Sequence, residues 1–179
     1  MKKCFLLFLI VIAGCAHGMD TGAKPETYAV NAPKGWRKIN TPKYYMITKD
    51  GAFLQYALIQ ERPIDKPFLY TKKKLRPGML PQEVAGIVVD ELSTDRTIIN
   101  FRLIENTLAS IKGNQGFKLL FTYKDRDGSA FKTKYYGFVR GNLYYNLRYT
   151  AARRHYFDKD EKTFDKFIQT FRIVTPQVF

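Results

Sequence analysis

The chain has 179 residues, 45% of them hydrophobic, which is enough for one domain with a substantial core. Lys and Arg number 30 against 16 Asp and Glu, and the formal net charge of +14 favours anionic surfaces or an acidic protein partner. A generally basic, solvated surface with no specific partner is the alternative. Two cysteines are too few for a disulfide scaffold, and no internal repeat is visible.

The N-terminus has the pattern of an export signal. Lys2 and Lys3 precede an apolar stretch at 5–13, which fits a signal peptide and is too short for a membrane-spanning helix of about 20 residues. The sequence Ile-Ala-Gly-Cys at 12–15 resembles the lipobox of bacterial lipoproteins. The resemblance implies cleavage after residue 14 and acylation, for example with palmitate, of Cys15. An ordinary secretory signal and a buried N-terminal strand are the alternatives.

Lipidation of Cys15 fixes the expected domain organisation. Residues 1–14 form the signal peptide, residues 15–27 a lipidated, flexible tether, and residues 28–179 a single domain. The domain then contains no thiol, unless the signal is retained and Cys15 forms a disulfide with Cys4. The resemblance implies export and a membrane anchor in the cell envelope. The outer membrane is favoured over the inner, because the residue after Cys15 is not Asp. Export argues against nucleic acid as a partner.

The first half of the domain predicts short strands followed by one helix. Strands are expected at 28–30, 44–48 and 53–60, and the last two are joined by a hairpin turn around Asp50-Gly51. A long polar connection follows at 62–77. Apolar residues at helical spacing then predict a helix from Pro81 to about residue 93.

The second half predicts an antiparallel meander and a last helix. Apolar runs at 98–110 indicate one bent strand or two, and alternating patterns at 117–124, 130–139 and 143–150 predict three more strands. Asp158 and Glu161 are expected to cap a helix whose aromatic stripe packs on the sheet, and a terminal strand is expected at 171–174. The predicted fold is α+β: an antiparallel sheet of about six strands packed with helices.

Two segments carry a resemblance to a known family. The sequence Pro-Lys-Gly-Trp at 33–36 is similar to a turn of PsbP-like domains, and the segment from 145 to 172 is similar to their C-terminal half. The family includes an extrinsic photosystem subunit, a nuclear-import cofactor and DcrB-like envelope lipoproteins. The resemblance implies a layered α+β sandwich and a role in binding or assembly. It carries over no functional residue.

The sequence predicts no catalytic, metal or cofactor site. His17 and His155 are isolated and form no zinc-binding pattern. The acidic run at 158–161 lacks the spacing of a calcium loop. Ser93, Ser110 and Ser129 lie outside any nucleophile-elbow sequence, so a catalytic triad is not expected.

Two sets of residues are candidate binding surfaces. The first is a basic run in the long connection, suited to anionic head groups or an acidic partner, with a solvated loop as the alternative. It comprises Lys72, Lys73, Lys74 and Arg76. The second is a Tyr- and Arg-rich partner-binding face on or beside the meander. It comprises Tyr135, Tyr144, Arg148, Arg153 and Arg154. The alternative is that a helix covers this face and leaves only the arginines exposed.

These features favour a non-catalytic, membrane-anchored envelope lipoprotein. Its expected partners are an acidic protein, an anionic lipid or lipopolysaccharide, and its oligomeric state is not predicted. A small-ligand or lipid carrier and an envelope hydrolase are the alternatives. A deep apolar pocket would favour the carrier, and a cleft with converging titratable groups would favour the enzyme.

Overall fold

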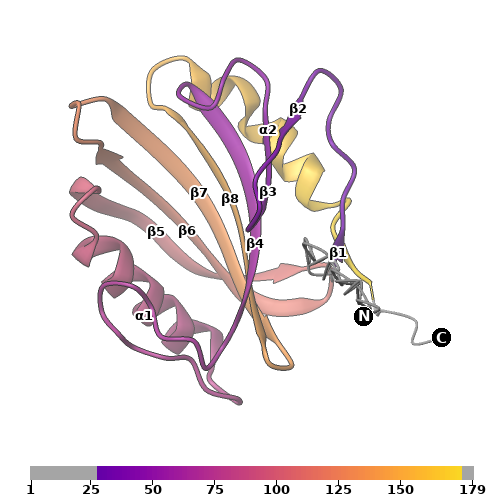
Figure 1. Ribbon diagram of the computed structural model, residues 1–179, viewed down its shortest axis with the longest axis vertical. Coiled ribbons are helices and arrows are strands. Elements are labelled where there is room, and N and C mark those ends of the chain that lie inside the picture. Colours follow the sequence, from indigo (N-terminus) through magenta and orange to yellow (C-terminus); the bar gives the residue numbers. More distant parts are fainter. Residues whose placement is uncertain (1–27, 175–179) are drawn as a thin grey trace, which may run out of the picture.

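The computed structural model describes residues 28–174. The predicted signal peptide, Cys15 and the predicted tether lie outside the described residues, so lipidation and export remain predictions. Figure 1 shows one curved sheet with a helix on each side. The predicted α+β class with an antiparallel sheet is confirmed.

The main sheet has seven antiparallel strands. In spatial order they are β2 (Arg37–Ile39), β3 (Tyr45–Thr48), β4 (Gln55–Pro63), β8 (Leu143–Ala152), β7 (Ala130–Arg140), β6 (Asn114–Lys124) and β5 (Ile99–Ile111). Strands β5 to β8 form the predicted meander, because each is hydrogen-bonded to the next. The apolar runs at 98–110 form one strand, whose pairing with β6 shifts register in two places.

Two short strands bring the ends of the domain together. β1 (Tyr28–Ala29) pairs antiparallel with β9 (Arg172–Ile173), as a separate sheet of two strands. The turn at 33–36 then leads into the main sheet, where the Trp36 amide donates to the Pro33 carbonyl over 3.1 Å. Gly35 has a φ of 82°, which a residue with a side chain rarely adopts.

The two helices begin in different ways. α1 (Pro81–Thr94) starts at the predicted proline, and the Glu83 carboxylate accepts a 2.6 Å hydrogen bond from the Leu80 amide. α2 (Tyr156–Ile168) starts two residues earlier than the predicted cap. His155 stands at the N-cap with a φ of 69° and makes no side-chain capping bond. The predicted capping by Asp158 is therefore wrong, because Phe157 is fully buried and draws the first turn onto the sheet.

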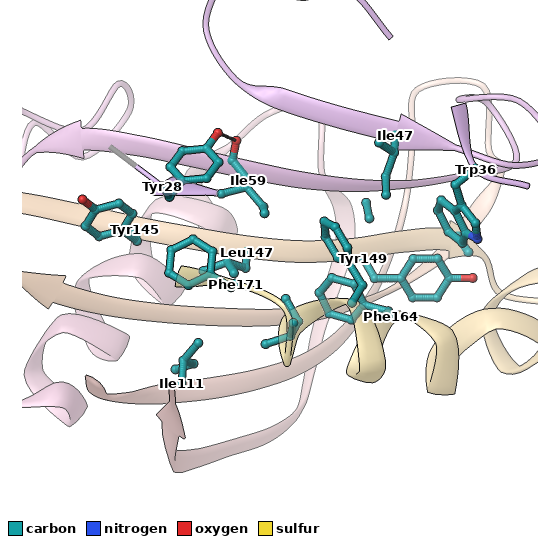
Figure 2. Packing of buried hydrophobic residues seen from close by; sticks show 14 of the residues in the cluster. Tyr28, Trp36, Ile47, Ile59, Ile111, Tyr145, Leu147, Tyr149, Phe164 and Phe171 are labelled. Atoms are coloured by element: carbon teal, nitrogen blue, oxygen red, sulfur yellow. Dashed lines mark hydrogen bonds between the residues drawn. The ribbon is translucent and has the colours of Figure 1, made fainter. Parts of the chain in front are cut away.

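The two helices lie on opposite faces of the sheet, and they cover different strands. α1 packs mainly on β5, β6 and β7, and α2 packs on β8 and β4 from the opposite side. We call these the α1 face and the α2 face. Strand β8 contributes side chains to the cores on both faces. Tyr145, Leu147 and Tyr149 belong to the core under α2, and Tyr144 belongs to the core under α1. Figure 2 shows the α2-side core, where Tyr149 lies beside Phe164 of α2.

Candidate binding surfaces on the α1 face

The long connection between β4 and α1 is an ordered loop on the α1 face. Ile64, Phe68 and Leu75 are buried and attach it to the core beside α1. Two backbone hydrogen bonds cross it, from the Phe68 amide to the Lys73 carbonyl over 2.8 Å and from the Leu75 amide to the Ile64 carbonyl over 3.0 Å. The loop therefore holds a defined shape.

Glu91 of α1 fixes the tip of this loop. Its carboxylate accepts hydrogen bonds from the amides of Tyr70 and Thr71, at 2.9 and 2.8 Å, and from the Thr71 hydroxyl at 2.8 Å. Burial raises the pKa of Glu91, but these donors outweigh it, so the net pKa lies below the ordinary value. Glu91 is thus an ionised clamp that connects the loop to α1.

The four predicted basic residues are exposed, as expected, but they differ in their contacts. Lys72 donates a hydrogen bond to the Leu69 carbonyl at 2.6 Å, and Lys73 forms a 2.5 Å ion pair with Asp90. The charged ends of Lys74 and Arg76 have no ion pair within residues 28–174, and both side chains line a groove. These two residues are therefore the available cations of the run.

The groove lies between the loop and the end of β4, with a volume of about 850 Å³. Its apolar lining comes from Pro63, Ile64, Leu75 and Pro77. Lys74 and Arg76 supply positive charge, and Asp65 and Asn142 are its other polar lining residues. A second pocket of about 320 Å³ lies on the other side of Pro77, against Met79, Val84 and Phe117. The arrangement is open and mostly apolar, with cations at its rim.

The predicted Tyr- and Arg-rich face is not one surface. Tyr135 and Tyr144 are 4% and 1% exposed and belong to the core under α1. Their hydroxyls lie 2.6 Å apart in a hydrogen bond. Burial raises the pKa of Tyr135 to about 12 and raises that of Tyr144 as well. The prediction that these two side chains face a partner is therefore wrong, because α1 and the loop cover them.

Arg148 lies apart from the other two arginines of that set. Arg153 and Arg154 are exposed in the turn that leads into α2. Arg148 is half-buried on the α1 face of β8, where its Cα faces Leu58 of β4 and Tyr135 of β7. Its Nε atom is buried and has no hydrogen-bond partner. Of the five predicted residues, only the arginines reach the surface.

Sequence reasoning missed Asn146, a neighbour of Arg148. Asn146 is 6% exposed, and its amide nitrogen donates to Gln60 Oε1 over 3.1 Å, while its Oδ1 atom is buried without a donor. The alternating pattern of β8 places Asn146 and Arg148 on one face, so their position was readable from the sequence. Their lack of partners was not.

The acidic run at the start of α2 is used in ion pairs. Asp158 pairs with Lys132 at 3.7 Å, Asp160 with Lys49 at 3.2 Å and Glu161 with Lys134 at 2.6 Å. Within residues 28–174 no group of three or more His, Cys, Asp or Glu side chains is arranged to hold a metal ion. In the same range neither helix has the length and hydropathy needed to span a membrane.

Comparisons with known proteins give the fold a precedent. A scan of family models finds none that matches this chain, and no curated protein matches its sequence. Among solved structures, cyanobacterial PsbP (CyanoP) of Synechocystis sp. PCC 6803 matches with a TM-score of 0.54 and 13% identity, over 82% of this chain and 86% of that one. The chain has a PsbP-like fold.

Other proteins share this PsbP-like fold. LpqN of Mycobacterium tuberculosis, described as involved in cell envelope biogenesis, matches with a TM-score of 0.57 and 15% identity over 83% of both chains. The Ran-binding protein Mog1p of Saccharomyces cerevisiae matches with a TM-score of 0.55 and 7% identity, over 83% of this chain and 90% of that one. The chain spans 47% of a matching protein from Bacteroides thetaiotaomicron. Identities this low show the fold alone.

Proposed function

We propose that this protein is a non-catalytic envelope lipoprotein, anchored through Cys15, that contacts anionic head groups through the basic loop at 72–76. The observation that carries the proposal is the pair of unpaired cations, Lys74 and Arg76, beside an apolar groove on a loop of defined shape. The envelope role of LpqN, which has the same fold, supports the location.

The loop suits an anionic surface for electrostatic reasons. Each Lys or Arg held close to an anionic membrane contributes roughly 1 kcal/mol to binding. The loop is fixed by Glu91 and by its buried apolar residues, so little conformational entropy is lost when its cations meet the surface. Lys74 and Arg76 need not break an existing ion pair to do so.

Binding to vesicles tests this contact. The mature chain with Cys15→Ser, which removes the expected lipid, would be sedimented with vesicles of phosphatidylglycerol and phosphatidylcholine. Replacing Lys74 and Arg76 with Gln is expected to weaken binding roughly thirtyfold, from about 2 kcal/mol. The matched control replaces Arg153 and Arg154, which lie at the start of α2, with Gln. Equal weakening in both variants would mean that only net charge matters.

The anchor needs its own test. In cells, Cys15→Ser is expected to block acylation and signal cleavage together, so that only the larger, unacylated precursor is found. Unchanged acylation and processing would contradict the lipoprotein proposal.

The groove favours a second candidate, a carrier for an anionic amphiphile. Its apolar lining would hold an acyl chain, and Lys74 and Arg76 would face the head group. Native mass spectrometry of the protein purified in mild detergent separates the two functions. A carrier is expected to retain one bound lipid per chain, and a protein that only touches head groups is expected to retain none.

A further inference from the structure

The α1 face holds a further cation, Arg148, which is not part of the basic loop. Arg148 lies in the middle of β8, between Leu58 of β4 and Tyr135 of β7. α1 packs mainly on the neighbouring strands β5, β6 and β7, and α2 lies on the opposite face. Part of the Arg148 side chain therefore remains accessible from the α1 face.

The charge of Arg148 has no counter-charge in the described part of the chain. None of the ion pairs of residues 28–174 includes it, and its Nε atom is buried without an acceptor. Removing a guanidinium from water is costly unless it is paired and hydrogen-bonded. The fold thus holds a cation ready for an anion.

Tyrosine side chains lie near this cation. The Tyr56 ring centre lies 6.0 Å from the guanidinium carbon, and Tyr44, Tyr123 and Tyr135 also raise the pKa of Arg148. Burial lowers the pKa of Arg148, but the tyrosines, Tyr56 first, outweigh it, so the net pKa is raised. Phenols are neutral at pH 7, so they supply no counter-charge there, and the Tyr56 ring contributes a cation–π contact.

Asn146 adds an unused acceptor two residues before Arg148. Along a strand, side chains two residues apart lie on the same face at a spacing of about 7 Å. Asn146 Oδ1 is buried without a donor, and the amide nitrogen of Asn146 donates to Gln60 Oε1. The site therefore offers a partner one donor group, the guanidinium, while the Asn146 oxygen stays beneath the surface.

We propose that Arg148, with the tyrosines beside it, forms a recognition site for an acidic residue of a protein partner. The side-chain carboxylate of that residue binds the accessible part of the Arg148 guanidinium. The half-exposed Tyr44, Tyr56 and Tyr123 add ring surface, and Arg with Tyr is the composition of strong protein contacts.

Titration with small probes tests the site. The full chain, purified in a nonionic detergent, is titrated with N-acetyl-glutamic acid amide while the Nε–Hε signal of Arg148 is followed by NMR. This probe carries both a carboxylate and amide N–H groups. We expect a saturable shift of the Arg148 signal and of the Asn146 side-chain amide. N-acetyl-glutamine amide, which lacks the charge, is expected to give none.

Two outcomes of the titration would overturn the proposal. Equal shifts with the glutamine probe would show that no carboxylate is recognised. Acetate binding as tightly as the glutamic acid probe would show a site for any small carboxylate and not for an acidic residue of a protein. The proposal expects acetate to bind at least about tenfold more weakly.

An isosteric substitution gives a second test that does not depend on a ligand. Asn146→Asp places a carboxylate beside Arg148 without changing the shape of the side chain. We expect a higher urea midpoint, because the cation gains a counter-charge, and at least tenfold weaker binding of the glutamic acid probe. Asn106→Asp, on the exposed edge strand β5, is the matched control and should leave probe binding unchanged. Asn146→Asp also removes the donor to Gln60, so the reference is Asn146→Ala, which loses the same bond, and a midpoint for Asn146→Asp below that of Asn146→Ala would show that Arg148 gains nothing from a counter-charge.

Discussion

The hydroxyls of Tyr135 and Tyr144 lie 2.6 Å apart in a hydrogen bond that is buried beneath α1 and the loop at 64–80. Each hydroxyl is the only partner of the other among the hydrogen bonds of the described residues. The pair crosses from β7 to β8 next to Gly137, which has no side chain to separate the two rings. It is a polar contact within an otherwise apolar core.

Removing one hydroxyl of this pair is expected to destabilise the domain. Tyr135→Phe or Tyr144→Phe leaves the other hydroxyl buried without a partner, at a cost of about 1–3 kcal/mol in the free energy of unfolding. The double variant is expected to lose less than the sum, because no polar group is then left unpaired. Urea denaturation measures all three values. Tyr136→Phe, on the opposite face, is the control, and additive effects would contradict the coupling.

Replacing Gly137 or Gly86 with Ala should change the stability of the domain in opposite directions. A Cβ atom on Gly137 would collide with the Phe117 ring and approach the Tyr144 hydroxyl to 2.6 Å. Gly137→Ala should therefore cost about 1–3 kcal/mol, because the core must shift. Gly86 lies in α1, where a Cβ would meet nothing within 4 Å, so Gly86→Ala should stabilise by about 0.5–1 kcal/mol. Thermal unfolding of the two variants checks the sign of each effect.

The sequence predicted local structure better than the way in which distant elements meet. Alternation along β8 placed Tyr144 and Arg148 on one face, and the hairpin signal at Asp50-Gly51 marked the turn between β3 and β4. Which part of a face is covered depends on where α1 and the loop settle, and those contacts are long-range. This is why Tyr144 was expected at the surface and lies in the core.

The same limit explains the start of α2. Asp158 and Glu161 form a local capping pattern, but the burial of Phe157 and the ion pairs of both acidic residues with lysines of β7 determine where the helix begins. Local signals specify that a helix forms there. Packing on the sheet decides its first turn.

Glu91→Gln should loosen the loop at 70–71. The substitution removes the charge that accepts hydrogen bonds from the Tyr70 and Thr71 amides, and we expect a loss of about 1–2 kcal/mol because the carboxylate is partly exposed. Hydrogen exchange at these two amides, faster in the variant than in the wild type, measures the local effect. Glu61→Gln, in β4, controls for the change in net charge. Unchanged exchange would show that the clamp is not needed.

The pH dependence of this clamp follows from the direction of the Glu91 shift. Its pKa is lowered in the folded state, so the stability it adds is fully present above its unfolded pKa near 4.5 and is lost as the pH falls through the lowered value. The difference in unfolding free energy between wild type and Glu91→Gln should therefore shrink below about pH 4.5. A difference that stays constant down to pH 2–3 would contradict this assignment.

Lys134 links the sheet to α2, and removing its acidic partners should destabilise the domain more than removing the lysine itself. The residue is 8% exposed, and its ammonium group lies 2.6 Å from Glu161 and 3.1 Å from Asp165. Replacing Glu161 with Gln and Asp165 with Asn leaves a buried cation without a partner, which should cost about 1–3 kcal/mol. Lys134→Met removes the cation itself and leaves two partly exposed carboxylates, so it should cost less than about 1 kcal/mol.

Alkaline pH tests the same contact from the other direction. Burial lowers the pKa of Lys134, but Glu161 and Asp165 outweigh it, so the folded pKa lies above 10.5. A raised pKa adds stability that is fully present below the unfolded value and is lost as the pH rises through the folded one. The wild type should therefore lose its extra stability over the double variant, in which Glu161 is Gln and Asp165 is Asn, above about pH 10.5. Urea midpoints measure this difference. If Lys134→Met proves as destabilising as the double variant at pH 7, the ion pairs themselves stabilise the domain and the expected difference between the two variants is wrong.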